Sequence, residues 1–209
     1  MDIIKRALDS GYQSVMVDGS RLPLDENIAT TLEVATLAKT YDAAVEAELG
    51  AVSGHEGSGI GLSYEELFAT KKGFTKPEEA TRFAKESGCD WLSVAAGSFH
   101  GAIAASTKHL KKPNARLDID HIKTLSEVTG KMPLVLHGGS GIEQDYILRA
   151  MESGIAKINV GTEIRQPYEF ALEEKPGDIA YAQEKVYERT RWVIHEFLRT
   201  TDNHDKLVK

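Results

Sequence analysis

Short apolar runs alternate with segments of helical periodicity along most of this chain. The runs are rich in β-branched residues and cover residues 14–19, 43–50, 91–97, 133–139 and 156–162. Amphipathic segments lie between them, at 26–42, 76–88, 118–130 and 143–154, and several end in glycine, a residue that commonly ends a helix. Strands that alternate with helices predict βαβ units and a parallel sheet. The runs are almost continuously apolar, which is typical of strands covered on both faces.

Helical patterns also occupy the two ends of the chain. Residues 1–12 have the spacing of an amphipathic helix. Two helical segments follow the last predicted strand, and the longer one covers residues 178–200. Its apolar side chains are expected to pack on the sheet or on a second subunit. We therefore predict a single domain over residues 1–209, in which residues from about 166 to 209 form a C-terminal helical extension.

Polar residues follow every predicted strand, and their distribution separates two architectures. In an open doubly wound sheet, site residues gather at one switch point. In a (β/α)8 barrel, they lie at the carboxyl ends of nearly all strands. The second pattern is found here, with one polar group after each strand in turn: Asp18, Glu48, His100, His137 and Asn159. The pattern therefore favours an α/β fold of the TIM-barrel type.

The number of predicted strands is smaller than a barrel requires. Such a barrel has eight strands in about 250 residues. We therefore expect an incomplete TIM barrel with about the last five strands plus C-terminal helices, and roughly 80 further residues before Met1. The loop at 51–73 contains GHEGSGIG and is long for a barrel, which marks it as a candidate active-site loop.

Composition excludes several classes of protein. Hydrophobic residues make up 41% of the 209, enough for a buried core, and the net charge of -7 disfavours binding to nucleic acid. There is no apolar stretch of the length that a membrane helix needs, so no membrane partner is expected. Cys89 is the only cysteine, which excludes an internal disulfide and suits the reducing cytoplasm.

Two histidines at strand ends indicate a metal site. His100 follows WLSVAAGSF, His137 follows PLVL, and both precede a glycine. On neighbouring strands of a barrel, the two imidazoles come together, as binding of a divalent transition metal requires. A third ligand is expected from elsewhere. Glu48 at a strand end is a candidate ligand, and Glu56 in the following loop is a candidate for moving protons.

Two successive glycine-containing loops indicate a phosphate site. GGSG at 138–141 precedes a predicted helix, so its backbone amides and the Ser140 hydroxyl can bind an anion. The next strand leads into Gly161 and Thr162 in the equivalent position. Phosphate sites in these barrels often use the loops after the last two strands.

The chain contains SVMVDGSRLPLDENI, VEAELGAVSGHEG, LSVAAGSFHG, PLVLHGGSGI and AKINVGTEIR in this order. Together these strings resemble the class II fructose-bisphosphate and tagatose-bisphosphate aldolase family over roughly residues 1–165. LHGGSG followed by KINVGTE is specific, and VEAELG adds independent support. The resemblance implies a lyase of glycolysis that cleaves fructose 1,6-bisphosphate to dihydroxyacetone phosphate and glyceraldehyde 3-phosphate. It needs a metal and no lysine Schiff base.

The resemblance also implies roles for individual residues. His100 and His137 would bind the catalytic zinc or a similar divalent ion, and Glu48 would lie near its alternative position. Glu56 would exchange protons at the reacting carbons. The remaining residues would bind the sugar phosphate and, in some members, a monovalent cation: Gly101, Gly138, Ser140, Asn159 and Thr162. A homodimer or homotetramer is the expected assembly.

One family motif is absent from this sequence. No Asp-His-Gly string occurs, and Asp120-His121 is followed by isoleucine within a predicted helix. In the family, that motif supplies a third histidine ligand and an aspartate acid. We therefore expect the chain to bind metal weakly and to show little aldolase activity.

Three other functions stay open. Tagatose 1,6-bisphosphate differs from the fructose substrate in the configuration of one hydroxyl group. A noncatalytic sugar-phosphate-binding protein descended from an aldolase would keep the same motifs. Another metal-dependent barrel enzyme, such as a hydrolase, is disfavoured by the two successive phosphate loops.

Overall fold

Five parallel strands form one sheet in which the order in space follows the order along the chain. The computed structural model describes residues 1–50, 64–98, 115–201 and 203. The sheet order is β1-β2-β3-β4-β5, and every neighbouring pair is parallel. The strands are β1 (Ser14–Val17), β2 (Ala44–Leu49), β3 (Trp91–Val94), β4 (Leu134–Leu136) and β5 (Ile155–Ile158).

Helices connect and follow these strands. They are α1 (Asp2–Asp9), α2 (Leu24–Lys39), α3 (Tyr64–Thr70), α4 (Pro77–Glu86), α5 (Ile119–Val128), α6 (Gln144–Glu152), α7 (Thr162–Glu174) and α8 (Ile179–Trp192), with a π-helical turn at Val193–Phe197. None of the helices in the described ranges is long and apolar enough to cross a membrane.

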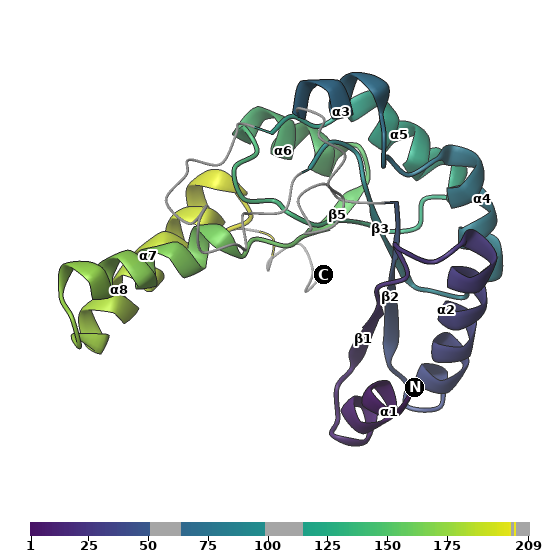
Figure 1. The fold of residues 1–209 in the computed structure, drawn as a ribbon, viewed down its shortest axis with the longest axis horizontal. Coiled ribbons are helices and arrows are strands. Elements are labelled where there is room, and N and C mark those ends of the chain that lie inside the picture. Colours follow the sequence, from purple (N-terminus) through teal and green to yellow (C-terminus); the bar gives the residue numbers. More distant parts are fainter. Residues whose placement is uncertain (51–63, 99–114, 202, 204–209) are drawn as a thin grey trace.

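The strand order decides between the two architectures considered from the sequence. A doubly wound sheet reverses its strand order at a switch point, whereas barrel strands follow one another around the axis. Here the sheet curves, and α2, α4, α5 and α6 lie along its outer side (Figure 1). The predicted α/β fold, with five barrel-type strands followed by C-terminal helices, is confirmed.

The core lies between the outer face of the sheet and these helices. On β1, Val15 and Val17 are buried towards the helices, whereas Ser14 and Met16 on the other face are exposed. Phe83 of α4 is among the fully buried side chains on the helix side. Burial of each such side chain contributes about 1.5–3 kcal/mol, so helix packing on this face stabilises the sheet.

The inner face of the sheet carries charged side chains beside apolar ones, whereas the sequence predicted almost continuously apolar strands. On β2, Val45, Ala47 and Leu49 share the outer face with the core, and Glu46 and Glu48 occupy the inner face. Side chains alternate between faces along a strand, so these two carboxylates point in the same direction. The strand is covered on both faces, but one of its faces carries acidic groups.

The C-terminal helices form a separate feature of the structure. Helices α7 and α8 pack against each other and extend away from the sheet (Figure 1). The turn that follows α8 returns to the core, where Val193 and Phe197 are buried. Tyr187 and Ile194 remain exposed.

Candidate active site

The candidate site is built around two buried carboxylates on the inner face of β2. Glu46 and Glu48 keep only 3% and 4% of their surface exposed. Strand β2 pairs with β1 on one side and β3 on the other, which holds the backbone of both residues in place. A buried carboxylate is costly without a partner, so each requires a hydrogen bond or an ion pair.

His137 supplies a partner for both carboxylates. It follows β4 directly, and its imidazole lies between them: Nε2 is 2.9 Å from Oε1 of Glu46, and Nδ1 is 2.9 Å from Oε2 of Glu48. Strand β3 separates β2 from β4, and Ser93 is the β3 residue in register with Glu48. The small side chain of Ser93 leaves room for the imidazole to reach across the strand.

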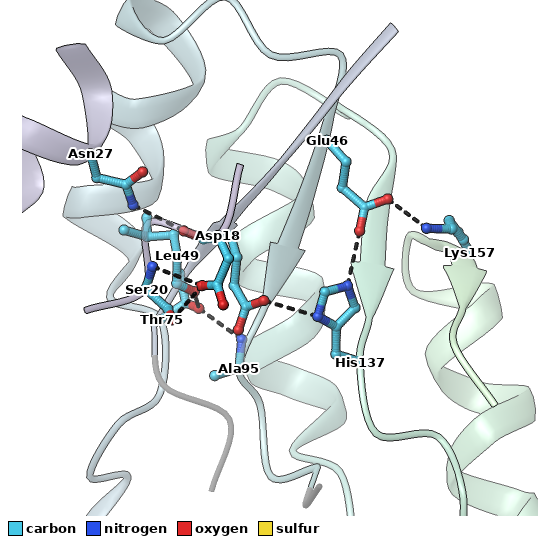
Figure 2. A network of polar contacts seen from close by, with 10 residues as sticks. Asp18, Ser20, Asn27, Glu46, Leu49, Thr75, Ala95, His137 and Lys157 are labelled. Atoms are coloured by element: carbon cyan, nitrogen blue, oxygen red, sulfur yellow. Dashed lines mark hydrogen bonds and ion pairs between the residues drawn. The ribbon is translucent and has the colours of Figure 1, made fainter. Parts of the chain in front are cut away.

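Lys157 of β5 completes this polar group, as Figure 2 shows. Its Nζ lies 2.6 Å from Oε2 of Glu46, the carboxylate oxygen that His137 does not contact. Lys157 also lies near the ring of Trp91, with 5.8 Å from Nζ to the ring centroid. Side chains of β2 and β5 and of the residue that follows β4 therefore meet on the inner face.

These contacts control the protonation of the site. Burial alone would lower the pKa of His137, but the hydrogen bonds and charges of Glu46 and Glu48 outweigh it and raise this pKa to about 9. Burial alone would raise the pKa of Glu46, but its bonds with His137 and Lys157 hold it below the ordinary value. At neutral pH, His137 in this arrangement is therefore a protonated imidazolium between carboxylates.

The donor atoms suit a divalent transition metal. Imidazole nitrogen and carboxylate oxygen are common zinc ligands, and His137 and Glu48 present one of each side by side. Beside Glu48, the buried hydroxyl of Ser93 has no hydrogen-bond partner among the described residues. Within the same ranges, no group of three or more His, Cys, Asp or Glu side chains is arranged to hold a metal. The described residues thus contribute part of a ligand set.

The two predicted phosphate loops lie next to each other. The backbone amide of Gly139 donates to the carbonyl of Asn159 at 3.0 Å. The Ser140 hydroxyl, buried at 3% exposure, accepts from the backbone amide of Glu163 at 3.2 Å, in the first turn of α7. Thr162 is the first residue of that helix. The loops after β4 and β5 are therefore joined at a helix N-terminus, a position that favours anions.

Two polar side chains that lie outside the sheet hold the carboxyl ends of β2 and β3 in place. Asn27 of α2 is fully buried, and its Nδ2 donates to the carbonyl of Glu48 at 2.9 Å. The hydroxyl of Thr75 donates to the carbonyl of Leu49 and accepts from the amide of Ala95 (Figure 2). The carboxyl ends of β2 and β3 are thereby connected to each other and to α2.

Among the predicted site residues, the structure brings His137 and Glu48 into contact, although Glu48 lies on β2 and His137 follows β4. Gly138 and Ser140 lie in the loop that follows His137, and Thr162 begins α7. Asn159 lies in the loop after β5, where its backbone joins it to β4. The candidates Glu56, His100 and Gly101 fall outside the described residues.

Sequence reasoning missed Glu46 and Lys157. Glu46 lies two residues before Glu48, so the period of a strand already places both on one face. The lysine is inside the predicted strand AKINVGT, where a charged residue is unexpected unless it has a partner. The strand period and the lysine within a strand could have marked these two residues, but neither pattern predicts that Glu46 and Lys157 pair with each other.

The sequence matches known proteins over most of its length. The family model described as fructose-bisphosphate aldolase class-II matches residues 1–206. A 6-phospho-5-dehydro-2-deoxy-D-gluconate aldolase from Halalkalibacterium halodurans is 40% identical over 173 residues, covering 82% of this chain and 54% of that protein. A fructose-bisphosphate aldolase from Streptococcus pyogenes is 34% identical over 191 residues, covering 89% of this chain and 59% of that protein.

Solved structures show the same fold. The YdjI aldolase from Escherichia coli has a TM-score of 0.76 at 30% identity, with 97% of this chain and 67% of that chain covered. A protein from Coccidioides immitis described as a putative fructose-1,6-biphosphate aldolase has a TM-score of 0.77 at 28% identity, with 98% and 70% covered. The chain spans little more than half the length of the curated relatives it matches. It belongs to the class II fructose-bisphosphate aldolase family.

Proposed function

We propose that this chain carries the metal- and phosphate-binding part of an enzyme that cleaves and forms a ketose 1,6-bisphosphate by an aldol reaction. Fructose 1,6-bisphosphate is the proposed substrate, with dihydroxyacetone phosphate and glyceraldehyde 3-phosphate as products. One observation carries the proposal: His137 is held between two buried carboxylates immediately before the GGSG loop. Because the chain belongs to this family, this arrangement supports a role of His137 as a metal ligand and of the GGSG loop as an anion site.

Each proposed role follows from the chemistry of its residue. Zinc or another divalent metal, when bound, polarises the substrate ketone. His100, His137 and Glu48 are the proposed residues that hold it, and Glu56 exchanges a proton at the reacting carbon. Backbone amides and polar side chains hold the substrate phosphate and, as an additional proposal, a monovalent cation: Gly101, Gly138, Ser140, Asn159 and Thr162.

A second substrate has support from the comparisons. The relative named for 6-phospho-5-dehydro-2-deoxy-D-gluconate is 40% identical to this chain, against 34% for the fructose-bisphosphate aldolase of Streptococcus pyogenes. Both substrates have a ketone beside a phosphorylated terminal carbon, so one phosphate site can serve either. Tagatose 1,6-bisphosphate shares this half as well, and the assay below distinguishes the three.

The metal site is tested first, by calorimetric titration of the purified chain with Zn²⁺. We expect binding that is lost in His137→Ala and kept in His195→Ala, because His195 is exposed on the π-helical turn and lies outside the site. Equal zinc binding by the His137 variant would contradict the assignment.

Turnover is tested with the three phosphorylated keto compounds, by coupling formation of dihydroxyacetone phosphate to NADH oxidation. Because the sequence lacks Asp-His-Gly, we expect low rates, with the highest for the true substrate. Zinc and sugar-phosphate binding without turnover would instead support the noncatalytic alternative.

We further propose a homo-oligomer, a dimer or tetramer, in the cytoplasm with a role in glycolysis. The exposed apolar side chains of α7 and α8, such as Phe170 and Tyr187, support an association surface. Light scattering after size-exclusion chromatography measures the assembly, and a monomer at micromolar concentration would contradict it.

A further inference from the structure

Glu46 has no role in the proposed reaction, yet both of its carboxylate oxygens are engaged. Oε1 is 2.9 Å from Nε2 of His137, and Oε2 is 2.6 Å from Nζ of Lys157. The residue is 3% exposed, so water does not replace these contacts. A group that is this buried and this fully bonded has a defined orientation.

The position of Glu46 is set by the sheet. It lies in the middle of β2, in register with Met16 of β1 and Trp91 of β3. Glu48 is two residues further along the same strand, closer to the loops. The imidazole of His137 contacts Glu46 through Nε2 and Glu48, which is nearer the loops, through Nδ1.

Lys157 offsets the negative charge of the Glu46 carboxylate. Its ammonium group pairs with Glu46, so the two buried carboxylates do not compete for His137 alone. The side chain of Lys157 is 40% exposed, which leaves its ammonium group partly hydrated while it contacts a carboxylate that is almost fully buried. Lys157 therefore contacts one carboxylate oxygen of Glu46, and His137 contacts the other.

We propose that Glu46 and Lys157 are a positioning pair: Lys157 fixes the Glu46 carboxylate, which accepts from Nε2 of His137 and leaves Nδ1, beside Glu48, as the nitrogen that binds a cation. Metal-binding histidines commonly donate their second N–H to a carboxylate, which sets the ring orientation and tautomer. This inference rests on the proposed metal-dependent function. It adds two residues that touch neither the metal nor the substrate.

The test combines zinc affinity with the nitrogen chemical shifts of His137. Glu46→Gln and Lys157→Met are each titrated with Zn²⁺ in the calorimeter and compared with the unmodified chain. We expect Glu46→Gln to weaken zinc binding roughly 10- to 100-fold, as loss of such a partner typically does. Lys157→Met should weaken it in the same direction, and the double variant should bind no more weakly than Glu46→Gln, because the lysine acts through the glutamate.

Two further variants separate positioning from a general loss of structure. Lys157→Arg keeps a cation at this position and should restore most of the zinc affinity. Lys76→Met removes a lysine from an exposed ion pair with Glu79 at the start of α4, on the helix side of the sheet, and should leave zinc affinity unchanged. Circular dichroism establishes that each variant is folded before the affinities are compared.

The ring nitrogens of His137 provide a readout that needs no metal. In ¹⁵N spectra above its pKa, the unmodified chain should show the tautomer with the proton on Nε2, and Glu46→Gln should lose this preference. Unchanged zinc affinity and unchanged nitrogen shifts in both variants would overturn the positioning role while leaving the proposed function intact. If the unmodified chain binds no zinc, the proposed metal site fails, and the nitrogen shifts alone decide whether Glu46 orients the ring.

Discussion

The free energy of unfolding should depend on pH through His137. Its pKa is about 9 in the folded chain, against an ordinary value of 6.5, so between these values the folded chain holds a proton that the unfolded chain has released. Stability from this group is complete below about pH 6.5 and is lost as pH rises through about 9. Because one pKa unit corresponds to about 1.4 kcal/mol, the full loss is about 3 kcal/mol, an order-of-magnitude figure.

Urea denaturation in the presence of a metal chelator measures this dependence. Unfolding followed by circular dichroism should give a free energy that falls by about 3 kcal/mol between about pH 6 and about pH 9.5. In Glu48→Gln one of the two carboxylates that stabilise the imidazolium is neutral, so the fall should be smaller. Glu79→Gln, which removes a carboxylate from an exposed ion pair with Lys76, is the matched control and should retain the full dependence.

Two results would refute the reasoning. One is an unfolding free energy that stays constant over this pH range in the unmodified chain. The other is an equal pH dependence in Glu48→Gln, because it would show that another group is responsible. Direct titration of the His137 ring by NMR would then show whether its pKa is raised. A midpoint near 6.5 would mean that the two carboxylates do not stabilise the imidazolium.

Two further predictions concern the framework of the site. Thr75→Val removes the hydroxyl that links the ends of β2 and β3 and leaves a buried carbonyl and a buried amide unpaired. Urea denaturation should therefore show a loss of about 1–3 kcal/mol in the free energy of unfolding. An unchanged denaturation midpoint would contradict the link. Gly139→Ala would place a Cβ atom 2.6 Å from Cγ2 of Ile158, so it should destabilise the chain by about 1–3 kcal/mol. A thermal midpoint equal to that of the unmodified chain would show that the loop moves aside without cost.

The order of strands and helices is a local property, which is why it was predictable. Segments such as 14–19 carry β-branched residues and end at glycine, and segments such as 118–130 carry helical periodicity. Asp118 accepts from the backbone amide of His121 at 3.0 Å and thereby begins α5 where the sequence pattern begins. Each signal depends on neighbours within one turn or one strand, so no knowledge of the fold is needed to recognise it.

The polar inner face was only partly predictable. Period-two alternation places Glu46 and Glu48 on one face, but composition alone suggests that VEAELG is an ordinary buried strand. A strand can carry buried charges on one face only if other residues on that face pair with them. Those partners come from strands that are distant in sequence, here from His137 and Lys157.

The sequence by itself determined the family, the succession of elements, and the presence of His137 and the GGSG loop at the end of a strand. Only the tertiary structure decided that His137 bridges Glu46 and Glu48 and that Lys157 holds the first of them. The physical reason is distance along the chain. Glu46 on β2 and His137 just after β4 are 91 residues apart, and β3 lies between these two strands. Their contact therefore depends on sheet register and on the small side chain of Ser93 between them.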